Sequence, residues 1–215
     1  MVRNELRDLL YPCNLGIKLS TDFSKSLAEN LSKFINLAFD SFFYNIFVSE
    51  WNINHHYLIN LGREENIRKN EQFNETVILY PTNIFYTSLK LLHYFHDYST
   101  LRLGITNLPL YSSAKKNLLF LYGEAHINQK CAVVSSYNLR EIQMDLQIEH
   151  PVVEQRIIKE CIHEIGHLIL GINHCINPDC VMNYSNNLQK VDEKTSFPCN
   201  SCYAKLEEIR EIYNF

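Results

Sequence analysis

The five residues His163-Glu164-Ile165-Gly166-His167 decide how this sequence is interpreted. On an α-helix, residues four apart lie above one another on one face, so His163 and His167 can direct imidazole nitrogens at the same metal ion. Glu164 lies about 100° further round the helix, where its carboxylate can reach a water on that ion without binding the ion itself. The run therefore predicts a metal site with an adjacent base.

The flanking sequence predicts that this run lies on a helix. Pro151 suits the first turn of a helix, and Gly171 suits its end because glycine readily adopts the left-handed conformation found there. Both histidines lie off the apolar stripe of this helix, so we do not expect them to be core histidines. The stripe repeats every four residues: Val153, Ile157, Cys161, Ile165 and Ile169.

The motif H-E-x-x-H on a helix is typical of zinc metallopeptidases, in which zinc lowers the pKa of a water and the glutamate takes its proton. Catalytic zinc normally has three protein ligands, and the next histidine is His174, three residues after Gly171. A turn at Gly171 would bring His174 back under the helix, and Met182 follows further along. A glycine-ended helix, a third histidine and a downstream methionine together describe the metzincin arrangement.

A carboxylate further along the chain is the alternative third ligand, as in gluzincins. The candidates are Asp192 and Glu193, but no second ligand helix is recognisable around them. A solvated charge cluster is the simpler interpretation of these two residues.

Four cysteines in the last fifth of the chain predict a second zinc site of structural type. Cys175 and Cys180 are five positions apart and Cys199 and Cys202 three, and both spacings suit a zinc knuckle. Disulfides or idle thiols are the alternatives. Disulfides need an oxidising compartment, and the start of the chain lacks the apolar segment of a secretory signal. The remaining cysteines have no ligand-like spacing: Cys13, Cys131 and Cys161.

With these motifs in order, the sequence resembles the archaemetzincin family from about residue 80 to residue 202. The segments that carry the resemblance, besides the histidines and cysteines, are Leu103–Thr106, Gly123–Ala125, Val133–Ser135 and Val181–Asn186. The resemblance implies a compact metzincin fold, a catalytic zinc bound by three histidines and a second zinc bound by four cysteines. It does not imply a substrate.

One departure from the family pattern bears on the third ligand. Gly171 and His174 each come one residue late, so Asn173 occupies the usual position of the third histidine. One extra helical residue turns the chain by about 100° and lifts it by about 1.5 Å, although a π-bulge could restore the phase. We expect His174 rather than Asn173 to be the ligand, because imidazole binds zinc better than an amide.

The pattern along the chain predicts one α+β domain over residues 1–215: a metzincin-like mixed, twisted sheet, an active-site helix and a short, mostly irregular C-terminal subdomain. The N-terminal subdomain would span about 1–171 and the C-terminal one about 172–215. The expected strands are 14–19, 41–48, 102–106, 118–122 and 131–135, with helices at 20–39 and 81–98, a solvated loop or short helix at 62–74 and a terminal helix from Tyr203.

Composition excludes some partners. The net charge of −4 argues against nucleic acid, and no run is long enough to span a membrane. We therefore expect a cytoplasmic protein, a monomer, acting on peptides or proteins, with one of the two strands before the zinc helix as the sheet edge to which a peptide adds.

The function expected from the sequence is zinc-dependent peptide hydrolysis. His163, His167 and His174 would bind the catalytic zinc, Glu164 would be the base, and Cys175, Cys180, Cys199 and Cys202 would bind the structural zinc. The alternative is a catalytically inactive, zinc-stabilised module that binds protein or peptide, because fold does not guarantee chemistry. Two roles are open for Tyr184, which comes two residues after Met182: it is either a packing residue or a group close to the metal.

Overall fold

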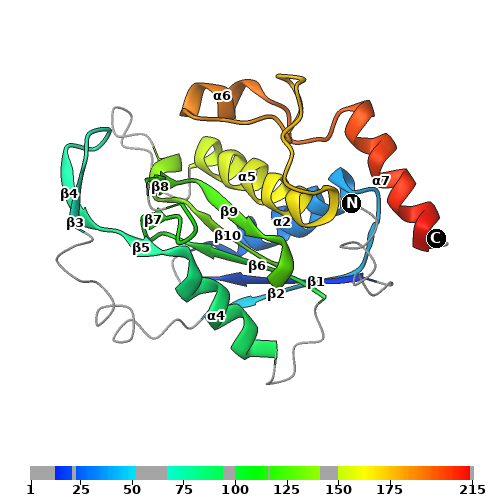
Figure 1. Cartoon of the computed structure of the whole chain (residues 1–215), viewed down its shortest axis with the longest axis horizontal. Helices are drawn as coiled ribbons and strands as arrows, with labels where there is room; N and C mark the ends of the chain where they lie inside the picture. The colour runs from blue at the N-terminus through cyan, green and yellow to red at the C-terminus, as the bar shows by residue number, and fades with distance from the viewer. Residues whose placement is uncertain are drawn as a thin grey trace.

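The computed structural model describes residues 13–20, 23–51, 67–93, 100–115, 117–140 and 150–213 of the chain. Its centre is a five-stranded sheet with the order β2-β1-β6-β10-β9 (Figure 1). Strands β2, β1, β6 and β10 run parallel, whereas β9 pairs antiparallel with β10 and forms one edge. The predicted mixed sheet is confirmed. Its strands are β1 (Cys13–Leu19), β2 (Phe43–Glu50), β6 (Leu101–Thr106), β9 (Gly123–His126) and β10 (Cys131–Ser135).

Helices cover both faces of this sheet. Helices α2 (Lys25–Ala38) and α5 (Pro151–Leu170) pack against each other on one face, and α4 (Thr82–His93) lies on the other (Figure 1). The larger core lies under α2 and α5, and a smaller one around Trp51 lies under α4. Parallel strands covered on both faces are buried along their length, and all six residues of β6 are buried, Arg102 and Thr106 among them.

Local capping sets where the two long helices begin. The Ser24 hydroxyl accepts a hydrogen bond from the backbone N–H of Leu27, so α2 begins at Lys25 rather than at the predicted Ser20. Helix α5 begins at Pro151 as predicted, and the Nδ1 atom of His150 accepts from the N–H of Val152.

The prediction of a loop or short helix at 62–74 is wrong for residues 67–70, which form a strand, whereas residues 71–74 form a turn. Strands β3 (Ile67–Asn70) and β4 (Glu75–Ile78) form an antiparallel hairpin, while residues 62–66 lie outside the described part of the chain. The hairpin is mostly exposed, so its side chains lack the apolar alternation that marks a half-buried strand. Contacts with distant residues hold it instead: Asn70 donates to Asn138 at 3.0 Å, and the Tyr137 hydroxyl donates to Glu75.

The prediction that one of the two strands before the zinc helix forms a sheet edge is wrong for the five-stranded sheet. Neither of the two expected strands before the zinc helix is the edge: β10 lies inside the sheet, and residues 119–121 form β8 of a small separate sheet with β5 (Tyr80–Pro81) and β7 (Leu110–Tyr111). The edges of the five-stranded sheet are β2 and β9, and β9 consists of the four residues Gly-Glu-Ala-His, whose composition carries no strand pattern.

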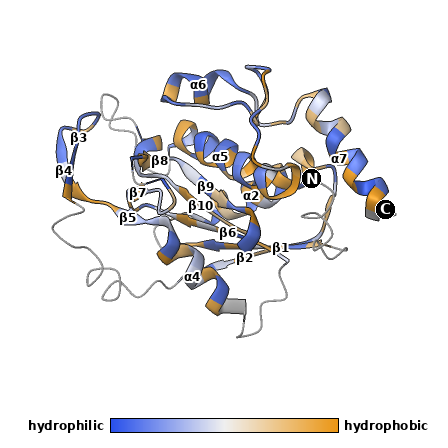
Figure 2. Ribbon diagram, in the orientation of Figure 1, coloured by the Kyte–Doolittle hydropathy of each residue, from blue (hydrophilic) through white to orange (hydrophobic). Residues whose placement is uncertain are grey.

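The other α-helices of the described residues pack against α5 (Figure 1). They are α6 (Leu188–Glu193) and α7 (Asn200–Tyr213), and α7 begins three residues before the predicted Tyr203. Figure 2 shows α4, α5 and α7 with alternating apolar and polar bands, as amphipathic helices require. The predicted helix 81–98 is α4, and residues 94–98 lie outside the described residues. Within the described residues, no helix is long and apolar enough to cross a membrane.

Candidate metal centre

Helix α5 brings His163 and His167 together as their spacing predicts. Their Nε2 atoms lie 3.0 Å apart, and their rings meet edge to face with centroids 4.5 Å apart. Both imidazoles are nevertheless buried, 5% and 7% exposed, so a position off the apolar stripe did not make them exposed. The C-terminal segment covers them, since the backbone of Val181 contacts His163.

The other nitrogen of each ring is already engaged. His163 Nδ1 donates to the Val181 carbonyl oxygen at 2.7 Å, and His167 Nδ1 donates to that of Gly171 at 2.9 Å. A carbonyl oxygen only accepts, so the proton of each neutral imidazole is assigned to Nδ1 and a free lone pair to Nε2. Two lone pairs that face each other repel unless a cation lies close to both. This donor set fits a metal ion, and such backbone contacts orient metal-binding histidines.

His174 joins this pair from the segment after α5. Its ring centroid lies 5.3 Å from that of His163 and 4.9 Å from that of His167. One ligand nitrogen from each of the three histidines falls within 4.8 Å of the others. Asn173, the alternative raised by the shifted spacing, is exposed, as His174 is.

The extra residue before Gly171 does not produce a π-bulge. Helix α5 is α-helical to Leu170, and the Gly171 N–H donates to the His167 carbonyl oxygen at 3.1 Å. The chain then leaves the helix at Gly171 with φ of 94°, a conformation that favours glycine. The change of direction therefore happens after the helix, over the three residues that precede His174.

Desolvation favours the neutral form of these imidazoles. Desolvation lowers the pKa of His163 well below its usual range and that of His167 less far, and it brings the pKa of His174 to about 4. The neutral form is the one that binds a metal. The three side chains are therefore ready to act as ligands at neutral pH.

Glu164 lies beside the histidines and is 5% exposed. Its side chain lies against the backbone of Gly123 in the edge strand β9. Burial first, and the neighbouring Glu160 second, raise the pKa of Glu164 well above its usual range, while Lys194 acts in the opposite sense. A carboxylate whose pKa is raised in this way is suited to accept and return a proton near neutral pH.

Met182 packs against α5 at Gly166. A Cβ atom on Gly166 would stand 2.2 Å from the Met182 Sδ atom, so only glycine leaves room for this contact. The methionine and the helix motif thus fit together through the second of the two variable positions of H-E-x-x-H.

The four predicted cysteines gather in a second cluster. One sulfur from each of Cys175, Cys180, Cys199 and Cys202 lies within 4.8 Å of the others, and all four are free thiols. Two of the sulfur–sulfur distances are 3.6 Å, for Cys175–Cys199, and 3.8 Å, for Cys180–Cys202. A tetrahedral zinc with bonds of about 2.3 Å requires sulfur–sulfur distances of about 3.8 Å, so the cluster fits zinc. The three other cysteines are buried in the core: Cys13, Cys131 and Cys161.

Protonation within this cluster is uneven. Burial raises the pKa of the Cys199 thiol, but hydrogen bonds from the Cys202 N–H and from the neighbouring thiols outweigh it and bring that pKa to about 6. A thiolate is the form that binds zinc.

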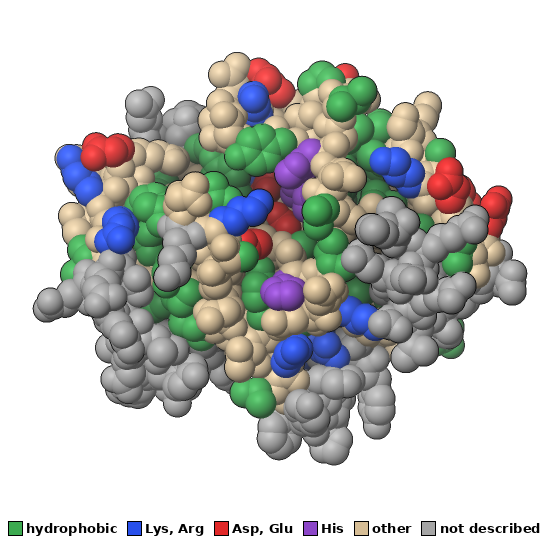
Figure 3. Space-filling view, viewed as in Figure 1, with side chains coloured by type: hydrophobic (Ala, Val, Ile, Leu, Met, Phe, Trp, Pro, Cys, Tyr) green, Lys and Arg blue, Asp and Glu red, His purple; other side chains and the backbone are tan. Residues whose placement is uncertain are grey.

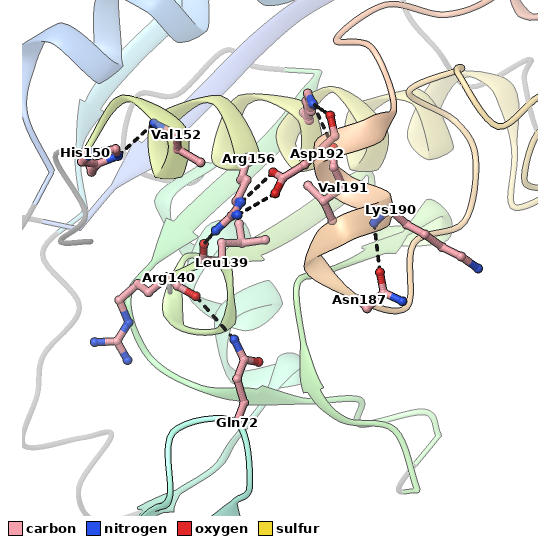
Figure 4. Close-up of polar contacts among 11 residues, drawn as sticks. Gln72, Leu139, Arg140, His150, Val152, Arg156, Asn187, Lys190, Val191 and Asp192 are labelled. Atoms are coloured by element: carbon pink, nitrogen blue, oxygen red, sulfur yellow. Dashed lines mark hydrogen bonds and ion pairs between the residues drawn. The ribbon is translucent and has the colours of Figure 1, made fainter. Parts of the chain in front are cut away.

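Asp192 and Glu193, the alternative carboxylate ligands, are engaged elsewhere. Asp192 binds Arg156 of α5 through two contacts of 2.7 and 2.6 Å (Figure 4), and Glu193 accepts from Gln189 at 2.7 Å. Arg156 also donates to the Leu139 carbonyl oxygen. Arg156 and Asp192 thus fix α6 on α5, and neither acid joins the histidine group.

The sequence did not indicate two features of the surroundings. Glu124 of β9 accepts hydrogen bonds from the hydroxyls of Thr82, Tyr86 and Ser112, which joins the edge strand to α4 and to the loop after β7. The only signal was its place in the Gly123–Ala125 segment. The second feature is a buried ion pair between Glu160 and Lys194, at 2.9 Å, which no local pattern predicts. Figure 3 shows acidic side chains in a hollow on this face with a histidine at its rim.

Comparisons with known proteins agree with this geometry. A model of Peptidase family M54 matches residues 57–208, more than half of the chain. The archaemetzincin of Pyrococcus horikoshii is 39% identical over 106 residues, which cover 49% of this chain and 54% of that protein. The archaemetzincin of Methanocaldococcus jannaschii is 41% identical over 111 residues, which cover 52% and 59%. The matched part spans about half the length of these curated relatives.

Solved structures share the fold. The crystal structure of archaemetzincin from Methanopyrus kandleri has a TM-score of 0.67 at 20% identity, covering 93% of this chain and 96% of that one. The archaemetzincin structure from Archaeoglobus fulgidus, complexed with malonate, has a TM-score of 0.58 at 23% identity, covering 89% and 99%. At such identities the likeness shows the fold alone.

Proposed function

The chain belongs to Peptidase family M54, and on that premise we propose that it is a zinc-dependent metallopeptidase that hydrolyses peptide bonds. The observation that carries the proposal is the pair of Nε2 atoms of His163 and His167, 3.0 Å apart, with both Nδ1 atoms bound to carbonyl oxygens. His174 completes three ligands, and Glu164 lies beside them as the base. Three histidines with a separate glutamate are the donor set of a catalytic rather than a structural zinc.

Each residue has a defined task in the proposed reaction. Zinc, when bound, supplies a Lewis acid that lowers the pKa of water and polarises the scissile carbonyl. Glu164 takes the proton of the attacking water and returns it to the leaving amine. The carbonyl groups of Val181 and Gly171 keep the helix histidines in one tautomer and one orientation. The substrate peptide lies along β9, whose outer edge has no partner strand among the described residues.

We further propose a second, structural zinc bound by Cys175, Cys180, Cys199 and Cys202, which gives two zinc ions per chain. The sulfur–sulfur distances support it. Thiolates that bind zinc in place of forming disulfides require a reducing compartment, and this supports a cytoplasmic location. Residues 1–171 and 172–215 would form the two subdomains of one metzincin-like domain, active as a monomer, without nucleic acid or membrane as partners.

The proposal is tested by the Glu164→Gln variant, which keeps the shape of the side chain but removes the base. We expect peptide cleavage to fall by at least about a hundredfold, the usual lower range for loss of a general base, with zinc content unchanged. Glu208→Gln, an exposed glutamate of α7, is the matched control and should leave activity unchanged. Cleavage by Glu164→Gln at the wild-type rate would overturn the mechanism, and a wild-type protein that binds zinc and peptide without cleavage would identify a binding module instead.

The ligand assignment has its own test. His174→Ala should remove the exchangeable zinc, whereas Asn173→Ala and Glu193→Ala should retain it. Loss of zinc in Asn173→Ala or in Glu193→Ala would instead identify the substituted residue as the third ligand.

A further inference from the structure

The histidine cluster and the cysteine cluster share one short loop. His174 belongs to the first and Cys175, the next residue, to the second, so a single peptide bond joins them. His174 is exposed and lies on no helix or strand. Its direction depends on the contact of its ring with Tyr184 and on the backbone on either side, which on the C-terminal side passes directly into Cys175.

The same loop joins the clusters a second time at its other end. Cys180 is a member of the cysteine cluster, and the carbonyl oxygen of the next residue, Val181, accepts the hydrogen bond from His163 Nδ1. The N–H of Cys175 donates to the Met182 carbonyl oxygen at 2.8 Å, which closes the loop. The ends of the loop thus reach two of the three histidines, one by a covalent bond and one by a hydrogen bond.

Asn183 holds the two ends of this loop together. Its side-chain Nδ2 donates to the Cys175 carbonyl oxygen at 2.7 Å, and its N–H donates to the Cys180 carbonyl oxygen at 2.9 Å. Cys175 and Asn183 also form an isolated parallel bridge. The side chain is half-buried, and the carbonyl it binds belongs to the peptide unit between Cys175 and Ile176, one residue beyond His174.

We propose that Asn183 is a positioning residue for His174, and that through it the two clusters are coupled: a metal ion in either cluster raises the affinity of the other. The inference rests on the proposed function only in taking the histidine cluster as a zinc site. Ordering the loop costs conformational entropy. A metal ion in the cysteine cluster already orders the loop, so the histidine cluster loses less conformational entropy when it binds its own ion and binds it more tightly. By linkage the effect is reciprocal.

The experiment measures zinc affinity rather than peptide cleavage. Zinc is removed from the histidine cluster with dipicolinate and titrated back in competition with a chromophoric chelator. In Asn183→Ala we expect the dissociation constant of this exchangeable zinc to rise by about tenfold, the lower end of the effect of losing an outer partner of a metal ligand. Asn187→Ala is the matched control, because it also loses one side-chain hydrogen bond to the backbone, that from the Lys190 N–H, but lies outside the loop.

A second measurement uses the wild-type protein and does not depend on the variant. Cobalt in the cysteine cluster gives thiolate charge-transfer absorption, so its removal by a chelator can be followed directly. We expect the chelator concentration needed for half removal to be about tenfold higher when zinc fills the histidine cluster than when that cluster is stripped, because the coupling is reciprocal.

The outcomes are distinct. Three results would each overturn the coupling. The first is equal zinc affinity in Asn183→Ala and wild type, and the second is a loss of zinc affinity in Asn187→Ala as large as that in Asn183→Ala. The third is cobalt removal at the same chelator concentration whether or not zinc fills the histidine cluster. No exchangeable zinc in the wild-type protein would overturn both the coupling and the proposed function. Coupled affinities in a protein without peptidase activity would support the coupling and reject the proposed function alone.

Discussion

Gly123 of the edge strand and Glu164 of α5 are in direct contact: a Cβ atom on Gly123 would stand 2.7 Å from Cγ and 2.8 Å from Oε1 of Glu164. The neighbouring Glu124 is held by three hydroxyl groups, so β9 cannot easily move away. The absence of a side chain at Gly123 therefore determines where the carboxylate of Glu164 lies.

Gly123→Ala should displace Glu164 without disturbing the zinc ligands. We expect kcat to fall on the order of a hundredfold, because a displacement of about 1 Å of a catalytic group has that effect. Zinc content should stay at the wild-type value. Ala125→Gly, which weakens the same strand but adds no atom beside Glu164, is the control for steady-state kinetics. A Gly123→Ala enzyme with wild-type kcat would show that Glu164 has room to adjust.

Removing one partner of the buried ion pair of Glu160 and Lys194 should lower the free energy of unfolding strongly, whereas replacing both partners by apolar residues should lower it little. The two side chains are 5% and 1% exposed, so Lys194→Met or Glu160→Leu alone leaves an uncompensated buried charge. Each should lower the free energy of unfolding by about 3–5 kcal/mol, and the double variant should recover most of it. Denaturant unfolding of all four proteins gives the coupling energy, and additive losses would contradict a direct pair.

Cys199→Ser should destabilise the C-terminal segment selectively, because a thiolate zinc contributes about 10 kcal/mol or more to the folding of small zinc domains. We expect a lower melting temperature and limited proteolysis confined to residues 175–215. Cys13→Ser, which alters a buried thiol of β1 outside the cluster, should leave zinc content and the proteolysis pattern unchanged. Wild-type zinc content and melting temperature in Cys199→Ser would remove the structural zinc from the proposal.

Tyr184 contacts His174 edge to face with ring centroids 5.1 Å apart, and it is 55% exposed. Tyr184→Phe keeps this ring contact, so we expect turnover within about twofold of wild type if the residue acts by packing. Tyr184→Ala removes the ring and should weaken zinc binding at the histidines. A loss of turnover of about tenfold or more in Tyr184→Phe, with zinc binding intact, would assign the hydroxyl a part in catalysis.

The parts of the site that the sequence could predict are those set by local geometry. His163, Glu164 and His167 lie on one helix, and a fixed rise and turn per residue place them whatever the rest of the chain does. The cysteine spacings work in the same way, because each pair lies within one short turn. The third histidine was harder, since a shifted spacing leaves the direction of the chain after Gly171 undetermined.

The parts that could not be predicted depend on contacts between distant segments. Glu160 and Lys194 are 34 residues apart, and the donors to Glu124 come from residues up to 42 positions away. The edge strand β9 is four residues of mixed character, and only its pairing with β10 makes it a strand. These ion pairs, hydrogen bonds and strand pairings arise from tertiary packing, which patterns in a single sequence do not reveal.

The exit of the chain from α5 at Gly171 has a consequence for how this protein can vary. His174 is held from its C-terminal side by Cys175. The number of residues between Gly171 and His174 therefore does not determine where His174 lies. Insertions and deletions that would ruin a ligand carried on a helix can be absorbed there by a change of path. We therefore expect the site to tolerate changes in the number of residues between Gly171 and His174, so that new sequence could be inserted there next to the metal.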